Sequence, residues 1–322
     1  MKLVEILKKV ILINKETRRL FYKKIANYFF SIFSILFFFK EILEIVGIYE
    51  YSFIQPIAML SAIILIVLIT AIIISYFDFK KYYKKKYKID DEKYIEIRVG
   101  DYIENAKQLV EEDNRNNFEN RIFFIFGTNN GFRFDVVLRG SLQYDFIKEF
   151  LQVEYETYQA MIDDFFSKSD VQPIGTSTYN NQEYFLYNFG TICEIKFPVT
   201  ELKIEDRFSL LLFANSKRNE NANIVGDVHT LGNIKNVWKY MREKRYTNKR
   251  ILIPLLGTGC SNTITYKKSI KAIIDAFFDD INNNSIPAFK EIIISIQPEK
   301  IGSNIDLLEI ERYIELKKLF YK

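Results

Sequence analysis

The sequence contains few of the residues that build metal sites, disulfide frameworks and catalytic triads. It has one histidine, His229, and two cysteines, Cys193 and Cys260, among 322 residues. The cysteines lie far apart and have no metal-ligand spacing, so we expect neither a disulfide framework nor a bound metal. A single histidine, with no acid or nucleophile at a recognisable spacing, also argues against zinc chemistry and a Ser-His-Asp triad.

The larger part of the chain also lacks an excess of basic residues. Residues 1–89 hold 15 Lys and Arg against 6 Asp and Glu, whereas residues 90–322 hold 30 against 35. A nucleic-acid-binding domain normally carries a basic surface. The net charge of −5 in residues 90–322 therefore argues against nucleic acid as a partner.

The first part of the chain contains two uncharged apolar runs. Residues 51–77 hold no charged residue, and about 20 apolar residues suffice to cross a bilayer as a helix. Residues 25–39 form a shorter run rich in Phe, which would need snorkelling flanks or a thinned bilayer. The runs predict a transmembrane hairpin at residues 25–77, with helices at 25–39 and 53–77. A buried core helix or a signal-peptide region is the alternative for the shorter run.

Basic residues flank the two runs. Eight Lys and Arg precede residue 25 and six lie within residues 80–88, whereas residues 40–52 hold one Lys against three Glu. By the positive-inside rule, both chain ends would be cytoplasmic in a multi-pass protein of the inner cell membrane. Residues 1–24 then predict an amphipathic cytoplasmic segment, residues 78–89 a basic juxtamembrane linker, and residues 90–322 a cytosolic domain.

From Asp90 onward, short apolar runs alternate with helical periods. Strands are predicted at 94–99, 121–126, 184–197, 208–214, 250–256 and 291–296. Helices are predicted at 141–151, 153–166, 231–244, 266–278 and 307–320. This alternation predicts an α/β domain in which helices cover both faces of a mixed sheet, with ligand loops at the carboxyl ends of strands.

Two loops after strongly apolar strands are rich in Gly, Thr and Asn. Residues 127–135 have the sequence GTNNGFRFD, and residues 257–262 have the sequence GTGCSN. Glycine allows close approach of the backbone to a ligand, and successive N–H groups bind anions such as phosphate. Together the loops predict a site for a nucleotide or another phosphorylated ligand. An ordinary tight turn is the alternative for each.

The order of the motifs along the chain resembles that of a macro domain. The motifs are VGDYI at 99–103, FGTNN at 126–130, SLQYDFI at 141–147 and IPLLGTG at 253–259. With two apolar runs before them, they resemble more specifically the divergent macro domain of Thoeris anti-phage effectors. The resemblance implies an N-terminal two-helix transmembrane hairpin followed by a macro-like α/β/α sandwich with a mixed sheet.

The resemblance also implies an ADP-ribose-like ligand and no other cofactor. The acid that contacts adenine falls on Asp101, the loop around the distal ribose on residues 127–131, and the diphosphate loop on residues 257–261. A plain turn or cap role is the alternative for Asp101 and the two asparagines. The implied ligand-binding set is Asp101, Tyr102, Gly127, Thr128, Asn129, Asn130, Ser141, Gly257, Thr258, Gly259, Cys260, Ser261 and Asn262.

A role in antiviral defence follows from the same resemblance. A companion TIR-domain enzyme would convert NAD into a soluble ADP-ribose-derived signal, which can carry an amino acid. The domain would bind this signal, form a homo-oligomer and disrupt the membrane, causing abortive infection. GTNNGF replaces the glycine-rich ribose loop of hydrolytic macro domains, so binding without catalysis is expected. A membrane-tethered ADP-ribosyl hydrolase is the alternative, and a structural anchor for a protein partner is a third hypothesis.

Overall fold

The computed structural model contains two compact units. One comprises residues 1–84 with 301–303, and the other comprises residues 85–300 with 304–322. The residues that the structure describes are 22–23, 25–32, 34, 64–73, 84–115, 122–134, 141–179, 182–196, 208–218, 224–226, 230–246, 249–258, 264–284, 287–301 and 304–321.

The first unit does not bear out the transmembrane hairpin. Across the described part of the chain, no helix is both long and apolar enough to cross a membrane. The predicted hairpin, and with it a multi-pass location in the inner membrane, is therefore wrong for these residues. The rest of 25–39 and 53–77, and residues 1–21, lie outside the described residues.

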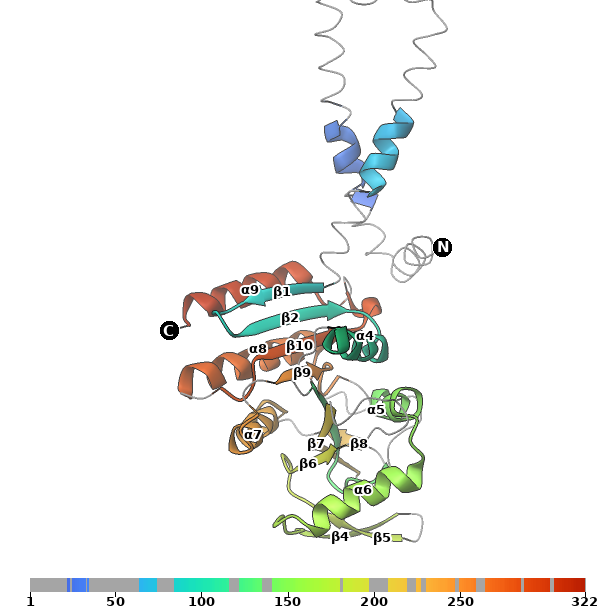
Figure 1. Ribbon diagram of the computed structural model, residues 1–322, viewed down its shortest axis with the longest axis vertical. Helices are drawn as coiled ribbons and strands as arrows, with labels where there is room; N and C mark the ends of the chain where they lie inside the picture. The colour runs from blue at the N-terminus through green and yellow to red at the C-terminus, as the bar shows by residue number, and fades with distance from the viewer. Residues whose placement is uncertain are drawn as a thin grey trace, which may run out of the picture. The chain divides into compact units, whose positions relative to one another are not determined.

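The second unit is built on a mixed sheet of eight strands (Figure 1). The strands are β1 Lys84–Lys88, β2 Tyr94–Val99, β3 Ile122–Asn129, β6 Ile192–Lys196, β7 Phe208–Arg218, β8 Ile224–Gly226, β9 Arg250–Ile253 and β10 Glu291–Ile296. Their order is β1-β2-β10-β9-β3-β7-β6, and β8 pairs with β7 beside this path. β2, β10, β9, β3 and β7 run parallel, whereas β6 and β8 are antiparallel to β7. A separate hairpin pairs β4 Gly175–Tyr179 with β5 Gln182–Leu186.

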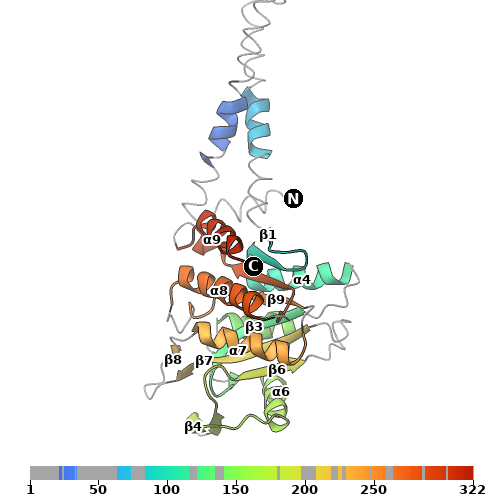
Figure 2. The same ribbon diagram turned by 90° about the vertical axis from the view of Figure 1, so that its left-hand side faces the viewer.

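Helices cover both faces of the sheet (Figure 1). On one side lie α4 Tyr102–Arg115, α5 Leu142–Asp145, the π-helical segment η2 Phe146–Leu151 and α6 Tyr155–Ser167. On the other lie α7 Thr230–Glu243, α8 Tyr266–Asn283 and α9 Leu307–Leu319, which Figure 2 shows one below another. A 3-10 turn, η3 Pro298–Lys300, follows β10. This mixed α/β arrangement fits a macro-like fold, as the alternation of strands and helices predicts.

The core consists of strands buried on both faces and of aromatic side chains between sheet and helices. Every residue of β9 and β10 is buried, because helices cover both faces. On the side of α4 to α6, Phe124 packs against Phe146, Phe150 and Phe208 at ring-centroid distances of 5.1, 5.4 and 5.4 Å. Tilted and edge-to-face pairs of this kind add to the stability that burial provides.

The run at 184–197, predicted as one strand, forms two. β5 ends at Leu186 and β6 begins at Ile192. Between them Gly190 has φ of 80°, and a Cβ added there would lie 2.3 Å from Nδ2 of Asn236. Any residue other than glycine would be strained and would clash at this turn. Asn188 and Gly190, two residues that favour turns, stand inside this apolar run and were the sequence signal for a break between two strands.

Candidate functional site

The predicted site residues follow parallel strands that end at the same side of the sheet. In β2, β10 and β9 the register places Val99 beside Ile296, and Ile294 beside Ile253. β3 and β7 run in the same direction beside them. Loops after parallel strands therefore meet at one edge, here named the carboxyl edge, where open α/β sheets bind ligands.

Asp101 follows β2 and caps α4. Its Oδ1 accepts hydrogen bonds from the backbone N–H groups of Ile103 and Glu104, at 2.9 and 3.0 Å. Aspartate is favoured at this position because it satisfies free N–H groups and interacts with the positive end of the helix dipole. The residue is exposed, and the cap uses one carboxylate oxygen. The cap role left open by the sequence is thus observed, and Oδ2 is left for a donor on a ligand.

Tyr102 is part of the core. Its side chain is 2% exposed, and its hydroxyl donates to the carbonyl oxygen of Leu252 at 3.0 Å. The ring packs edge-on against Phe126 and Phe146. Burial raises the pKa of Tyr102 well above its usual value. The side chain therefore ties α4 to β9, and only the backbone of Tyr102 remains for contact with a ligand.

The predicted ribose loop is shorter than expected, because β3 continues to Asn129. Its ladder with β7 shifts register between Thr128 and Asn129, as in a β-bulge. Asn130 and Gly131 form the turn that follows. Apart from Gly127, these residues are buried.

Both asparagine side chains of this loop are hydrogen bonded inside the protein. Oδ1 of Asn129 accepts from the N–H groups of Gly131 and Arg133 at 3.1 and 3.2 Å, and its Nδ2 donates to the carbonyl of Arg133 at 2.9 Å. Nδ2 of Asn130 donates to the carbonyl of Tyr187 at 3.3 Å. These bonds hold the turn in place, which is the alternative role noted from the sequence. Contact of either side chain with a ligand stays a prediction.

Gly131 is covered by the β4–β5 hairpin. A Cβ added at Gly131 would lie 2.5 Å from Cε2 of Tyr184 in β5. The backbone of the predicted ribose loop therefore touches an aromatic ring directly, and only glycine permits this approach. The hairpin forms one wall of the loop.

The predicted diphosphate loop begins with a glycine turn after β9. Gly257 has φ of 70°, a conformation that glycine adopts readily. Its carbonyl accepts from the N–H of Ile264 at 3.2 Å, and Oγ1 of Thr258 donates to the carbonyl of Leu255 at 3.0 Å. These bonds close the base of the loop. Gly259, Cys260, Ser261 and Asn262 lie outside the described residues.

Two helices begin at the carboxyl edge. α8 follows the diphosphate loop, with Thr265 as N-cap whose hydroxyl accepts from the N–H of Lys268 at 3.3 Å. α4 begins directly after Asp101. The amino end of a helix carries partial positive charge and favours an anion. At α4 the carboxylate of Asp101 already occupies this position, so the amino end of α8 is the one suited to an anionic ligand.

Ser141 caps α5. Its Oγ accepts from the N–H of Tyr144 at 3.3 Å, which is a structural role common for serine at this position. Phe146 of the following η2 packs against Tyr102 at 5.7 Å, so this segment lies beside α4. A ligand contact by Ser141 stays a prediction.

The sequence analysis missed Asn215 and Ser216 at the end of β7. Asn215 is 4% exposed, and its Oδ1 accepts from Nδ2 of Asn233 in α7 at 3.0 Å. Oγ of Ser216 donates to the carbonyl of Thr128 at 3.2 Å. Both residues support β3 where the ribose loop begins. The signal in the sequence was a polar pair directly after the apolar run 208–214.

Groups suited to metal or covalent chemistry are not gathered here. Within the described residues, no cluster of three or more His, Cys, Asp or Glu side chains could hold a metal ion. Cys193 is buried in β6, and burial raises the pKa of its thiol well above the usual value. A protonated, buried thiol is a core residue and not a nucleophile. His229 and Cys260 lie outside the described residues.

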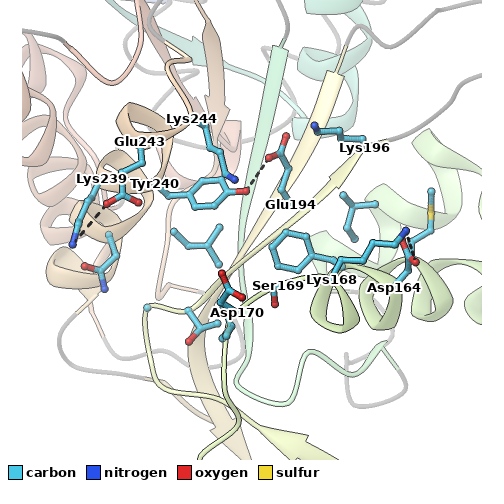
Figure 3. Close-up of a pocket in the computed structure, with 18 residues that line it drawn as sticks. Asp164, Lys168, Ser169, Asp170, Glu194, Lys196, Lys239, Tyr240, Glu243 and Lys244 are labelled. Carbon is cyan, nitrogen blue, oxygen red and sulfur yellow. Dashed lines mark hydrogen bonds and ion pairs between the residues drawn. The ribbon is translucent and has the colours of Figure 1, made fainter.

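A surface pocket of about 920 Å³ lies elsewhere, along β6 between α6 and α7 (Figure 3). None of the predicted site residues lines it. The pocket is therefore separate from the loops that follow β2, β3 and β9, and its shape says nothing about a ligand at the carboxyl edge.

The comparison with protein families connects this fold to one of them. The model for the macro domain of the Thoeris protein ThsA matches residues 95–297. The match begins in β2 and ends directly after β10, so it contains the loops of the carboxyl edge. A comparison with curated proteins gives no match. Since the matched region covers more than half of the chain, the protein belongs to the family of Thoeris ThsA macro domains.

Proposed function

We propose that the carboxyl edge binds an ADP-ribose-derived nucleotide and that the chain senses this signal in a Thoeris defence system. In this proposal a TIR-domain enzyme makes the nucleotide from NAD, and the signal can carry an amino acid. Family membership supports the proposal. The observation that carries it is that Asp101, the ribose loop and the diphosphate loop follow parallel strands at one edge.

The strand order matches the order of groups in such a ligand. β10 alone separates β2 from β9, and β9 lies directly beside β3. With strands about 4.8 Å apart, the ends of β2 and β3 are ~14 Å apart. Adenine near Asp101, diphosphate at Gly257 and the distal ribose near Gly127 would follow one another across the sheet. An extended ADP-ribose can therefore contact all three loops at once.

Backbone groups would provide most of the affinity for the diphosphate. The turn at Gly257 and the amino end of α8 supply N–H groups and a positive dipole without a side-chain charge. Oδ2 of Asp101 would accept a hydrogen bond from the amino group of adenine. The site would thus distinguish a nucleotide from a simple phosphate by its adenine end.

The proposed activity is binding without hydrolysis. The side-chain amide of Asn129 is bonded within its own turn, and Nδ2 of Asn130 donates to the carbonyl of Tyr187. These bonds support a structural role for both side chains rather than a role in orienting a water for attack. An assay for release of ADP-ribose from a modified protein tests this point. Turnover that depends on this edge would contradict it and would favour the hydrolase alternative.

Binding is further proposed to favour a homo-oligomer. A ligand shifts such an equilibrium only through its different affinity for the two forms. A change from 1:99 to 99:1 needs about 5.5 kcal/mol, which several ligands bound in one assembly can share. Light scattering with and without ligand measures this shift, and an unchanged mass would contradict it.

Calorimetric titration of the full chain with ADP-ribose tests the proposal as a whole. One site per chain is expected, and a concentration 100 times Kd should raise the free energy of unfolding by about 2.7 kcal/mol. AMP and ribose 5-phosphate serve as controls that contain only one end of the ligand, and both should bind more weakly. No heat and no stabilisation by ADP-ribose or an amino-acid conjugate at millimolar concentration would contradict nucleotide sensing.

A further inference from the structure

The outer face of α9 carries exposed apolar side chains. The inner face is buried through Ile310 and Ile314 and packs against α8 (Figure 2). Single exposed apolar residues are common on proteins, but several that adjoin on one face indicate an interaction surface. Four large apolar side chains on the outer face are 49% to 80% exposed, and they belong to Leu308, Leu316, Leu319 and, directly after the helix, Phe320.

Two charged residues lie between these apolar side chains. Leu308, Arg312, Glu315 and Leu319 follow one another at spacings of four, three and four residues, and all four are exposed. This is the spacing at which residues of one helix meet a second helix in a coiled coil. We name these four residues the α9 seam.

The other charges near the α9 seam are mostly engaged inside the chain. Glu309 and Lys317 pair with residues of α8 at 2.6 Å each, and Glu311 pairs with β1. By contrast, Arg312 and Glu315 form no ion pair with the described residues. The α9 seam therefore presents one positive and one negative side chain that can each pair with another molecule.

The α9 seam is complementary to itself when two helices run antiparallel. A two-fold axis at the middle of α9 places Arg312 opposite Glu315 of the second copy, and Glu315 opposite its Arg312. The same axis places Leu308 opposite Leu319 at both ends, so apolar side chains flank the two charge pairs. Lys318, exposed beside the seam, lies nearest the acidic first turn of the other helix. A parallel pair would instead place like charges opposite each other.

We propose that α9 is a self-association surface at which two copies of the chain pair their seams antiparallel. The 13 residues of α9 are ~20 Å long, so the contact is small and belongs with weak, transient interfaces. The dimer forms at high concentration or where copies are held close together. The proposal concerns the chain without ligand and does not depend on the nucleotide site. It goes beyond the assembly proposed above by naming the surface and its geometry.

Analytical ultracentrifugation of the full chain without nucleotide, from micromolar to millimolar concentration, tests the proposal. The average mass should rise toward that of a dimer as the concentration increases. Arg312→Glu and Glu315→Arg each place like charges opposite each other twice across the two-fold axis. Each variant should weaken self-association about tenfold, and circular dichroism checks that it is folded.

A mixture of the two charge variants is the sharpest control. One chain then presents two glutamates on its seam and the other presents two arginines, so an antiparallel pair contains both charge pairs again. The mixture should associate about as strongly as the unmodified chain, although neither variant does so alone. Damage to the fold of either variant cannot produce this recovery.

The apolar ends of the seam are tested separately. Leu319→Ser removes a side chain that the second copy would bury, and it should weaken self-association about tenfold. Phe185→Ser is the matched control, because Phe185 is also an exposed apolar residue but lies in β5. This control should leave self-association unchanged.

Three results would overturn the proposal. They are a mass that stays that of one chain at millimolar concentration, self-association that neither charge reversal weakens, and mixed variants that fail to associate. Protection of residues 1–24 from protease that Leu319→Ser removes, in a chain that does not self-associate, would assign the face to that segment instead. Nucleotide binding does not enter these measurements, so this proposal and the nucleotide proposal fail separately.

Discussion

The two ends of the parallel strands are built from different chemistry. At the amino ends, β9 begins with Arg250 and β10 with Glu291, whose side chains pair at 2.8 Å and are largely buried. At the carboxyl ends of β9 and β3, the chain continues into the uncharged turns at Gly257 and Asn130, while Asp101, the acid after β2, caps α4. One end is closed by paired charges, and the other presents backbone groups and helix amino ends.

The ion pairs at the amino ends form a network. Arg250 also approaches Glu112 and Asp113 of α4, at 3.4 and 3.6 Å, and Lys86 of β1 pairs with Glu291 at 2.7 Å. Buried charges are costly unless they are paired, so these side chains are committed to one another. The comparison teaches that the charges at the amino ends are committed to one another, whereas the anion site proposed at the carboxyl edge would rely on the amino end of α8, which needs no paired side chain.

Removal of Arg250 should have the largest effect on stability. Arg250→Ala leaves Glu291 and Asp113 with less compensation inside the protein, and we expect a loss of about 3 to 5 kcal/mol in the free energy of unfolding. Urea unfolding followed by circular dichroism measures this. Arg312→Ala on the exposed face of α9 is the control and should change stability by less than about 0.5 kcal/mol. A loss below about 1 kcal/mol for Arg250→Ala would contradict the interpretation that paired charges stabilise the amino ends of these strands.

Asp101→Asn should affect binding and not stability. The amide keeps an oxygen that can cap α4 but replaces the second acceptor by a donor, which opposes the amino group of adenine. We expect affinity for ADP-ribose to fall about 10- to 100-fold, or roughly 1.4 to 2.7 kcal/mol. Calorimetry measures the affinity and urea unfolding the stability. Asp101→Ala, which also removes the cap, should in addition lose about 1 kcal/mol of stability. Unchanged affinity in both variants would remove Asp101 from the site.

Gly131→Ala should destabilise the ribose loop moderately. Its Cβ would meet the ring of Tyr184 at 2.5 Å, and we expect a loss of about 1 to 2 kcal/mol. Tyr184→Ala opens this space, so in the double variant the Gly131→Ala change should cost much less than it does alone. Urea unfolding of the four proteins in this double-mutant cycle gives the coupling. Strict additivity would show that the hairpin does not pack on the loop.

The smallest effect is expected from acid titration at the amino ends. Partial burial opposes the shift, but hydrogen bonds from Lys93 and Tyr321 lower the pKa of Asp90 to about 2. The stability from this carboxylate is present above its unfolded pKa of about 3.9 and is lost as the pH falls through about 2. The side chain of Asp90 is 28% exposed, so solvent screens the interaction in part and we expect a contribution of about 1 kcal/mol or less. In Asp90→Asn, the free energy of unfolding should depend less on pH between about 4 and 2. An unchanged dependence would contradict the interaction of Asp90 with Lys93 and Tyr321.

Sequence patterns were most reliable for strands buried on both faces. The runs at 94–99 and 291–296 form β2 and β10 with the predicted bounds, because continuous β-branched residues fit a covered parallel strand. By contrast, no helix was expected at 102–115, where α4 forms. Its apolar face is interrupted by charged residues, but Ala106 and Leu109 are fully buried and the cap at Asp101 fixes its start.

The candidate site could be predicted in part. Glycine loops after apolar strands indicated loops that the structure places at one edge of the sheet, since both features are local; that these loops bind a ligand stays a prediction. The sequence could not show that the side chain of Tyr102 enters the core beside Leu252, or that Tyr184 covers Gly131, because these contacts join residues far apart in the chain. The transmembrane prediction, which used the uncharged runs, their basic flanks and the resemblance, was wrong for the described residues, where no helix is long and apolar enough to cross a membrane.

The sequence by itself determined where most of the buried strands lie and where glycine turns follow them. These properties depend on each segment's own side chains and backbone freedom. The tertiary structure alone decided that β10 inserts between β2 and β9, so that the three loops share one edge, and that β6 pairs only with β7 among the described strands. Any two extended segments can form the same backbone hydrogen bonds, whatever their side chains. The sequence of one strand therefore does not say which distant strand it pairs with. The order brings the three loops to the carboxyl edge, where the nucleotide site is proposed.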